Sequence, residues 1–165
     1  FEKGVLTNEF LETNVVDIYA AGDCAQFEDV VFERQHMLGN WANATSQGLT
    51  VGKTLCGERT KFDTVSSYTT NFFDPPNNGS CSFLGVTDVD FADRVIIRGS
   101  AQAGKVTRIF VKKISEVNRV VGATVINNPS DVAPLTTVIK GMVDIGTHLA
   151  DITSNDFDLK TLVVS

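Results

Sequence analysis

The 165-residue sequence has few of the side chains from which catalytic and metal centres are usually built. It contains two histidines and three cysteines, and no cysteines stand in a Cys-x-x-Cys spacing. Because zinc sites need clustered ligands and an odd cysteine count fits a disulfide framework poorly, we expect no metal site. Cys24, Cys56 and Cys81 are expected to be buried, reduced thiols. His36 and His148 lie far apart in the sequence, so local spacing indicates no acid–base pair and no catalytic residue is assigned.

Positive charge is scarce as well, because 14 Lys and Arg stand against 20 Asp and Glu, a net charge of −6. Nucleic acid and anionic membrane surfaces are therefore not expected partners. No apolar run approaches the roughly 18 residues of a transmembrane helix, and no secretory signal pattern is visible, so we expect a cytoplasmic location. With 42% hydrophobic residues the sequence can still form a core. Since it begins with Phe1 and not with Met, we expect a fragment of a longer protein.

The first part of the sequence predicts a strand, a turn and a helix in that order. Residues 15–21 form an apolar run, typical of a buried strand, which ends at Gly22 and Asp23. Small and apolar residues recur every three or four positions over 41–55, which predicts a helix whose narrow apolar face packs closely against another backbone. An Asp at a strand end can accept hydrogen bonds from ribose or ribityl hydroxyls, and a helix start favours an anionic group. The features favour a flavin or nucleotide site; the alternative is that Asp23 only caps a turn.

A change in sequence character near residue 60 predicts a domain boundary. Short β-type runs with hairpin-length connections follow it, at residues 81–85, 94–98, 106–113 and 119–126. We predict an antiparallel meander of four or five strands, with a helix over 131–142 covering one of its faces. The expected fold class is therefore α+β, an antiparallel sheet with packed helices.

Aromatic residues gather just before these runs, at Phe62, Tyr68, Phe72 and Phe73. They are more than a small domain usually leaves in contact with water. We therefore expect the chain to self-associate, either as a homodimer or by exchange of the N-terminal segment between two copies.

Two segments carry a resemblance to a known family. Residues 13–25, Thr-Asn-Val-Val-Asp-Ile-Tyr-Ala-Ala-Gly-Asp-Cys-Ala, resemble the second FAD signature of the FAD-dependent pyridine-nucleotide reductases, a strand ending in Ala-x-Gly-Asp. Residues 41–48, Trp-Ala-Asn-Ala-Thr-Ser-Gln-Gly, together with 55–57 and 68–74, resemble the branch of ferredoxin reductases, rubredoxin reductases and apoptosis-inducing-factor-like proteins. The related NADH oxidases and nitrite reductases are similar too. The resemblance covers nearly the whole chain.

The resemblance implies that residues 1–58 are the C-terminal end of an FAD-binding domain and that residues 60–165 are an α+β interface or dimerisation domain. It implies a parent oxidoreductase that passes electrons from NAD(P)H through FAD to an acceptor, with an electron-transfer protein as a partner. The family's Gly-x-Gly-x-x-Gly turn and NAD domain would precede Phe1, so we expect the fragment alone to be inactive and to bind FAD weakly. The rival hypothesis is an interaction or dimerisation module without catalysis of its own.

The resemblance also implies cofactor-binding roles for four residues. Asp23 would bind the ribityl chain, and Gly22 would let the backbone approach it. The helix start at Trp41 and Ala42 would face the pyrimidine edge of the flavin and stabilise negative charge on the reduced ring. Many of these reductases place a Trp over the flavin from the aromatic segment, and the position that corresponds to it here is Thr69.

Overall fold

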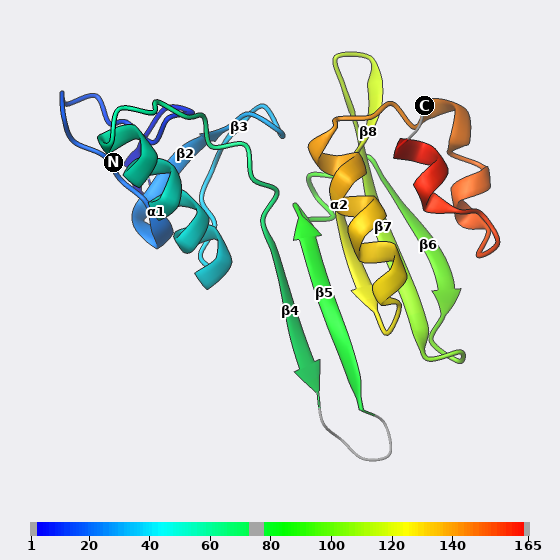
Figure 1. The fold of residues 1–165 in the computed structure, drawn as a ribbon. Coiled ribbons are helices and arrows are strands. Elements are labelled where there is room, and N and C mark those ends of the chain that lie inside the picture. Colours follow the sequence, from blue (N-terminus) through cyan, green and yellow to red (C-terminus); the bar gives the residue numbers. More distant parts are fainter. Residues whose placement is uncertain (1–2, 73–77, 164–165) are drawn as a thin grey trace. The chain divides into compact units, whose positions relative to one another are not determined.

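The computed structural model describes residues 3–72 and 78–163 (Figure 1). The chain divides into two compact units, residues 1–66 and residues 67–165. The elements of the first unit are β1 (Val5–Leu6), the 3₁₀ turn η1 (Gly22–Cys24), β2 (Ala25–Asp29), β3 (Arg34–His36) and α1 (Trp41–Leu55). In these described residues no helix is both long and apolar enough to cross a membrane.

The strand predicted over residues 15–21 is wrong, because residues 15–18 form an exposed loop and Tyr19 makes only an isolated bridge with Glu12. Asp17 adopts a positive φ of 63° and reverses the chain. The loop is closed by backbone hydrogen bonds from Thr13 N to Ile18 O at 2.9 Å and from Ile18 N to Val15 O at 3.2 Å. The strand of this region instead follows the Gly-Asp turn, as β2, which pairs parallel with β1 and antiparallel with β3. A continuous apolar run has no alternation of apolar and polar residues, so it does not by itself distinguish a strand from an exposed loop.

The core of the first unit is a small aromatic cluster. Phe27 from β2 packs edge-on against Phe62 at a ring distance of 5.2 Å, and Leu11 completes the buried set. The backbone N–H of Phe62 also donates to Glu9 O at 2.8 Å. Residues 60–66 therefore belong to the first unit, which ends at Ser66, later than the boundary expected near residue 60. Phe62 is buried, so it is not part of the exposed aromatic surface that the sequence predicted.

The helix predicted over 41–55 is confirmed as α1, but its buried face differs from the prediction. Trp41 is 83% exposed and Leu55 is 67% exposed. A Cβ added at Gly48 or Gly52 would meet no atom within 4 Å, so these glycines pack against nothing in the described structure. The buried side chains of α1 are polar: Asn43, Gln47 and Thr50.

The second unit is an α+β fold around a five-stranded antiparallel sheet, which confirms the predicted fold class (Figure 1). Its strands are β4 (Ser67–Phe72), β5 (Gly79–Gly85), β6 (Arg94–Ser100), β7 (Lys105–Ile114) and β8 (Val117–Ile126). Their order across the sheet is β4-β5-β8-β7-β6. The predicted simple meander is therefore wrong, because β8 lies between β5 and β7 instead of at an edge.

One helix, α2 (Val132–Lys140), packs on this sheet against β5 and β8 (Figure 1). Its buried residues include Leu135, Val138 and Ile139, the spacing of a helix face toward a core. The predicted helix over 131–142 is thus confirmed, with its C-terminus two residues earlier. The positive φ of 50° at Met142 is incompatible with a continued right-handed helix.

Four 3₁₀ segments complete the second unit: η2 (Pro129–Asp131), η3 (Gly146–His148), η4 (Asp151–Thr153) and η5 (Leu159–Val163). They follow the sheet in the sequence, η4 contacts β6, and η5 contacts α2. Ile152, Leu159 and Leu162 are buried, so this irregular C-terminal part contributes to the core.

Candidate functional site

The Gly22–Asp23 turn is held against α1 by a buried hydrogen bond. The backbone N–H of Gly22 donates to Gln47 Oε1 at 2.7 Å. Gly22 is itself buried and has a φ of +81°, a conformation that other residues adopt only with strain. A Cβ at this position would lie 3.4 Å from the Cβ of Ala44 on α1, so the turn and the helix are in close contact. These contacts fix the backbone from which Asp23 projects.

The start of α1 is defined by the side chain of Asn40. Its Oδ1 accepts a hydrogen bond from the N–H of Asn43 at 2.8 Å, and its Nδ2 donates to Ser66 Oγ at 3.0 Å. The cap satisfies one of the first amides of the helix. The amides of Trp41 and Ala42 lie in the first turn, where no carbonyl of the helix can accept from them. They are therefore free to bind a polar or anionic group.

Asp23 lies in a cavity of about 560 Å³ in the first unit. The cavity is lined by Lys3, Asp23, Gln26, Arg34, Gln35, His36, Met37 and Gly39. A Cβ at Gly39 would lie 3.6 Å from Cγ of Asp23, an ordinary van der Waals distance, so Gly39 lies directly beside the exposed carboxylate. Of the four predicted site residues, Asp23 lines this cavity, Gly22 is buried beside α1, and Trp41 and Ala42 begin the helix without lining the cavity.

His36 gives this cavity a neutral imidazole at pH 7. Its ring is packed edge-on against Phe27 at 5.6 Å. Burial, together with the positive charge of Arg34, lowers the pKa of His36 from 6.5 to about 4. Asp29 lies outside the cavity, at the end of β2, and burial raises its carboxyl pKa to about 6. The positive charges in the cavity are thus those of Lys3 and Arg34.

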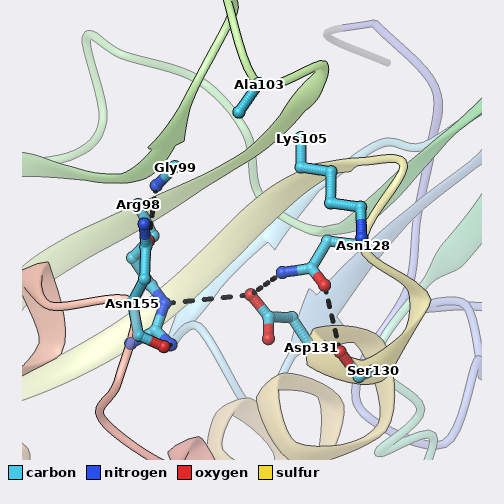
Figure 2. Close-up of a pocket in the computed structure, with 8 residues that line it drawn as sticks. All are labelled: Arg98, Gly99, Ala103, Lys105, Asn128, Ser130, Asp131 and Asn155. Atoms are coloured by element: carbon cyan, nitrogen blue, oxygen red, sulfur yellow. Dashed lines mark hydrogen bonds and ion pairs between the residues drawn. The ribbon is translucent and has the colours of Figure 1, made fainter.

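A second cavity, of about 310 Å³, lies in the second unit (Figure 2). Arg98 and Asp131 line it and are both buried, and Arg98 Nε lies 3.8 Å from Asp131 Oδ2. Arg98 also donates to the carbonyls of Ile152 at 2.8 Å and Phe157 at 2.9 Å, while Asn128 Nδ2 donates to Asp131 at 2.9 Å. Figure 2 shows the carboxylate between Asn128 and Arg98. Arg98 Nε has no hydrogen-bond partner among the described residues, but the other contacts of the two groups are with each other, with backbone carbonyls and with Asn128, which indicates a structural role.

The cysteines are free thiols, but the prediction that all three are buried is wrong. Cys24 and Cys56 are exposed, and Cys81 is half-buried. Cys24 therefore does not serve as a packing residue; its Sγ donates to Ala21 O at 3.5 Å. Within residues 3–72 and 78–163, no group of three His, Cys, Asp or Glu side chains could hold a metal ion.

No protein-family model matches the chain. Among curated proteins, a rubredoxin-NAD(+) reductase from Acinetobacter baylyi is 41% identical over 58 residues, which are 35% of this chain and 13% of that protein. A putidaredoxin reductase from Pseudomonas putida is 26% identical over 102 residues, 60% of this chain and 22% of the relative. The chain therefore spans less than a quarter of the length of these two relatives.

Solved structures match nearly the whole chain. The structure of the covalent putidaredoxin reductase–putidaredoxin complex matches 98% of it, at 20% identity and a TM-score of 0.82, over 36% of the solved chain. The chain therefore has the fold of the matching part of that reductase. A FAD-dependent pyridine nucleotide-disulphide oxidoreductase from Desulfovibrio vulgaris also matches 98%, at 16% identity and a TM-score of 0.71, over 41% of its length. The resemblance predicted from the sequence is confirmed.

Three residues that shape the site were not singled out by the sequence. Asn40 could have been found, since an Asn directly before a helical pattern is a common N-cap. Gly39 and Gln47 gave no such signal. The contact of Gly39 with Asp23 and the bond of Gln47 to Gly22 each join positions distant in the sequence, so they depend on the folded arrangement.

Proposed function

We propose that this chain is part of an NAD(P)H-dependent FAD oxidoreductase that passes electrons from nicotinamide through the flavin to an electron-transfer protein. The observation that carries the proposal is the Gly22–Asp23 turn, fixed to α1 by Gln47, with an open carboxylate in a cavity. The reductase fold and the names of the relatives support it. Because the chain spans only part of those relatives, the complete activity requires protein beyond the 165 residues.

The described residues fit a flavin cofactor. The Asp23 carboxylate is exposed and can accept hydrogen bonds from ribityl hydroxyls. The free amides of Trp41 and Ala42 and the positive end of the α1 dipole would stabilise negative charge at the pyrimidine edge. Bound FAD would supply the electron-transfer chemistry, whereas these residues bind and orient it. Because His36 is neutral at pH 7, it does not compete as a cation with the ribityl hydroxyls for the Asp23 carboxylate.

The 165-residue chain alone is proposed to be catalytically inactive and to bind FAD weakly. The cavity around Asp23 provides contacts for only part of so large a cofactor, and each missing charge-assisted hydrogen bond costs about 1.5–3 kcal/mol. Titration of the purified chain with FAD, followed by flavin fluorescence, should give no stoichiometric complex. A yellow preparation with one flavin per chain contradicts this proposal.

The role of Asp23 is tested in the longer protein that contains this segment. Asp23→Asn keeps the shape of the side chain but removes the charged acceptor, so flavin occupancy after purification should fall. Glu58→Gln is the matched control, because Glu58 is exposed and does not line the cavity. If Asp23→Asn retains flavin with unchanged affinity, Asp23 only caps the turn. Circular dichroism of both variants verifies that the fold is intact.

A second candidate function is self-association, as a homodimer or by exchange of the N-terminal segment. It is favoured by the aromatic residues of β4, since Tyr68 is 47% exposed and Phe72 is 41% exposed. Phe73, the fourth residue of the predicted aromatic set, lies outside the described residues. Exposed aromatic surface of this kind is typical of interfaces. Light scattering across a concentration series measures the association.

A cytoplasmic location stays a prediction from the sequence.

A further inference from the structure

The two edges of the five-stranded sheet differ in how they are protected. At the β6 edge, the N–H of Gly99 donates to Asn155 Oδ1 at 2.7 Å, and η4 packs against the strand. In the described part of the chain β4 pairs with β5 alone, and all six of its residues are exposed. Its sequence, Ser-Tyr-Thr-Thr-Asn-Phe, contains no charge and no proline. Natural edge strands usually carry charged residues or proline, because these residues prevent an open edge from pairing with another strand.

We propose that two copies of this chain associate through antiparallel pairing of their β4 strands, with Thr70 opposite Thr70 at a two-fold axis. This inference rests on the self-association proposed above and specifies its surface. Pairing of the two edges would continue the sheet of one copy into that of the other. The occupant is a second copy because the strand is uncharged and self-complementary, so pairing opposes no like charges.

The register follows from the geometry of antiparallel strands. Two residues that oppose each other point their backbone groups either both toward the partner strand or both away from it, and the two orientations alternate along a strand. In a symmetric pair a residue therefore opposes its own copy or one an even number of positions away. With Thr70 at the axis, Tyr68 opposes Phe72 of the other copy, and this aromatic pair occurs twice. With Thr69 at the axis, Tyr68 would oppose Thr70 and no aromatic pair would form. Aromatic and β-branched cross-strand pairs stabilise sheets, which favours the first register.

A cysteine placed at the axis tests the register directly. Thr70→Cys, in a background with Cys24→Ser, Cys56→Ser and Cys81→Ser, should form a disulfide between copies under mild oxidation, because opposed Cα atoms lie about 4.5–5.5 Å apart, a separation that disulfides span. Cys81 must be replaced because it opposes Thr70 within the β4–β5 hairpin. Gln102→Cys in the same background, in the exposed β6–β7 turn, is the control and should form no disulfide between copies. Crosslinking by Thr69→Cys but not by Thr70→Cys overturns the register.

A charge at the same position tests the surface without a covalent bond. Thr70→Lys opposes two ammonium groups across the axis and should raise the dimer dissociation constant roughly fivefold or more, whereas Gln102→Lys should leave it unchanged. Sedimentation velocity over a concentration series measures both, and circular dichroism verifies the fold. A dimer that is insensitive to Thr70→Lys overturns the β4 surface but retains self-association. A wild-type chain that is monomeric at every concentration overturns both self-association proposals, whereas the flavin proposal is tested separately by the flavin occupancy of Asp23→Asn.

Discussion

Arg98 Nε and Asp131 Oδ2 lie 3.8 Å apart, with both side chains almost completely buried in the second unit. Arg98 reaches from β6 to the carbonyls of Ile152 and Phe157, which belong to the irregular C-terminal part. Asp131 precedes α2 and accepts a hydrogen bond from Thr107 Oγ1 at 2.7 Å. The pair therefore connects the sheet, the start of α2 and the C-terminal turns through one set of contacts.

Removal of Arg98 should strongly destabilise the second unit. Arg98→Met would leave Asp131 as a buried charge without its partner and two carbonyls without a donor, so the free energy of unfolding should fall by about 3–5 kcal/mol. Arg94→Met, at an exposed position of the same strand, should change it by less than about 0.5 kcal/mol. Urea denaturation measures both variants. A loss below about 1 kcal/mol for Arg98→Met would show that the pair contributes little.

Gln47 should stabilise the first unit through the Gly22 amide. Gln47→Met keeps the volume but removes the acceptor, leaving a buried N–H unpaired at a cost of about 1–3 kcal/mol. Leu49→Met, at an exposed position of the same helix, is the control and should change the free energy of unfolding by less than about 0.5 kcal/mol. Thermal or urea denaturation measures both variants. A loss below about 0.5 kcal/mol for Gln47→Met would show that the hydrogen bond contributes little.

The second unit was largely predictable from the sequence because its periodicities are clear. Strands β5 to β8 alternate or cluster apolar residues between turn signals, and the stripe around Leu135 marks α2. The sequence did not predict β4 as a strand, because both of its faces are exposed and no alternation results. Nor did it predict the position of β8, since the order of strands depends on packing of the whole sheet.

The candidate site was predictable only where a motif marks it. Gly22 and Asp23 lie in the segment that resembles the second FAD signature. The start of α1 follows from the spacing of small and apolar residues over 41–55. The burial of α1 did not follow, because hydrophobic spacing assumes that apolar side chains face the interior. In α1 the side chains of Gln47 and Asn43 face the interior. Their amides bind the N–H of Gly22 and the carbonyl of Leu38, which lie in irregular segments and have no strand partners.

Exposed glycines in α1 should be replaceable with a gain in stability. Gly48→Ala and Gly52→Ala each add a methyl group that meets no atom within 4 Å, and alanine favours a helix interior by about 1 kcal/mol over glycine. The free energy of unfolding should therefore rise by about 0.5–1 kcal/mol for each. Gly22→Ala is the opposite control and should lower it, because the φ of +81° strains an alanine. A loss of stability for Gly48→Ala would mean that the chain packs another backbone against this face.

The depressed pKa of His36 should make the first unit lose stability as the pH falls. In the unfolded chain the imidazole takes up its proton near pH 6.5, whereas burial beside Arg34 lowers the pKa to about 4 in the fold. The stabilising contribution is therefore complete above pH 6.5 and is lost as the pH falls from 6.5 through about 4, by on the order of 2 kcal/mol. Asp29 acts in the opposite direction, because its raised pKa gives a contribution that is present below pH 3.8 and lost as the pH rises through about 6. The comparison of wild type with His36→Phe isolates the histidine, since Asp29 is common to both. Urea denaturation at several pH values between 4 and 7.5 should show that wild type loses stability relative to His36→Phe as the pH falls, and parallel pH profiles for the two proteins would contradict a half-buried, neutral His36.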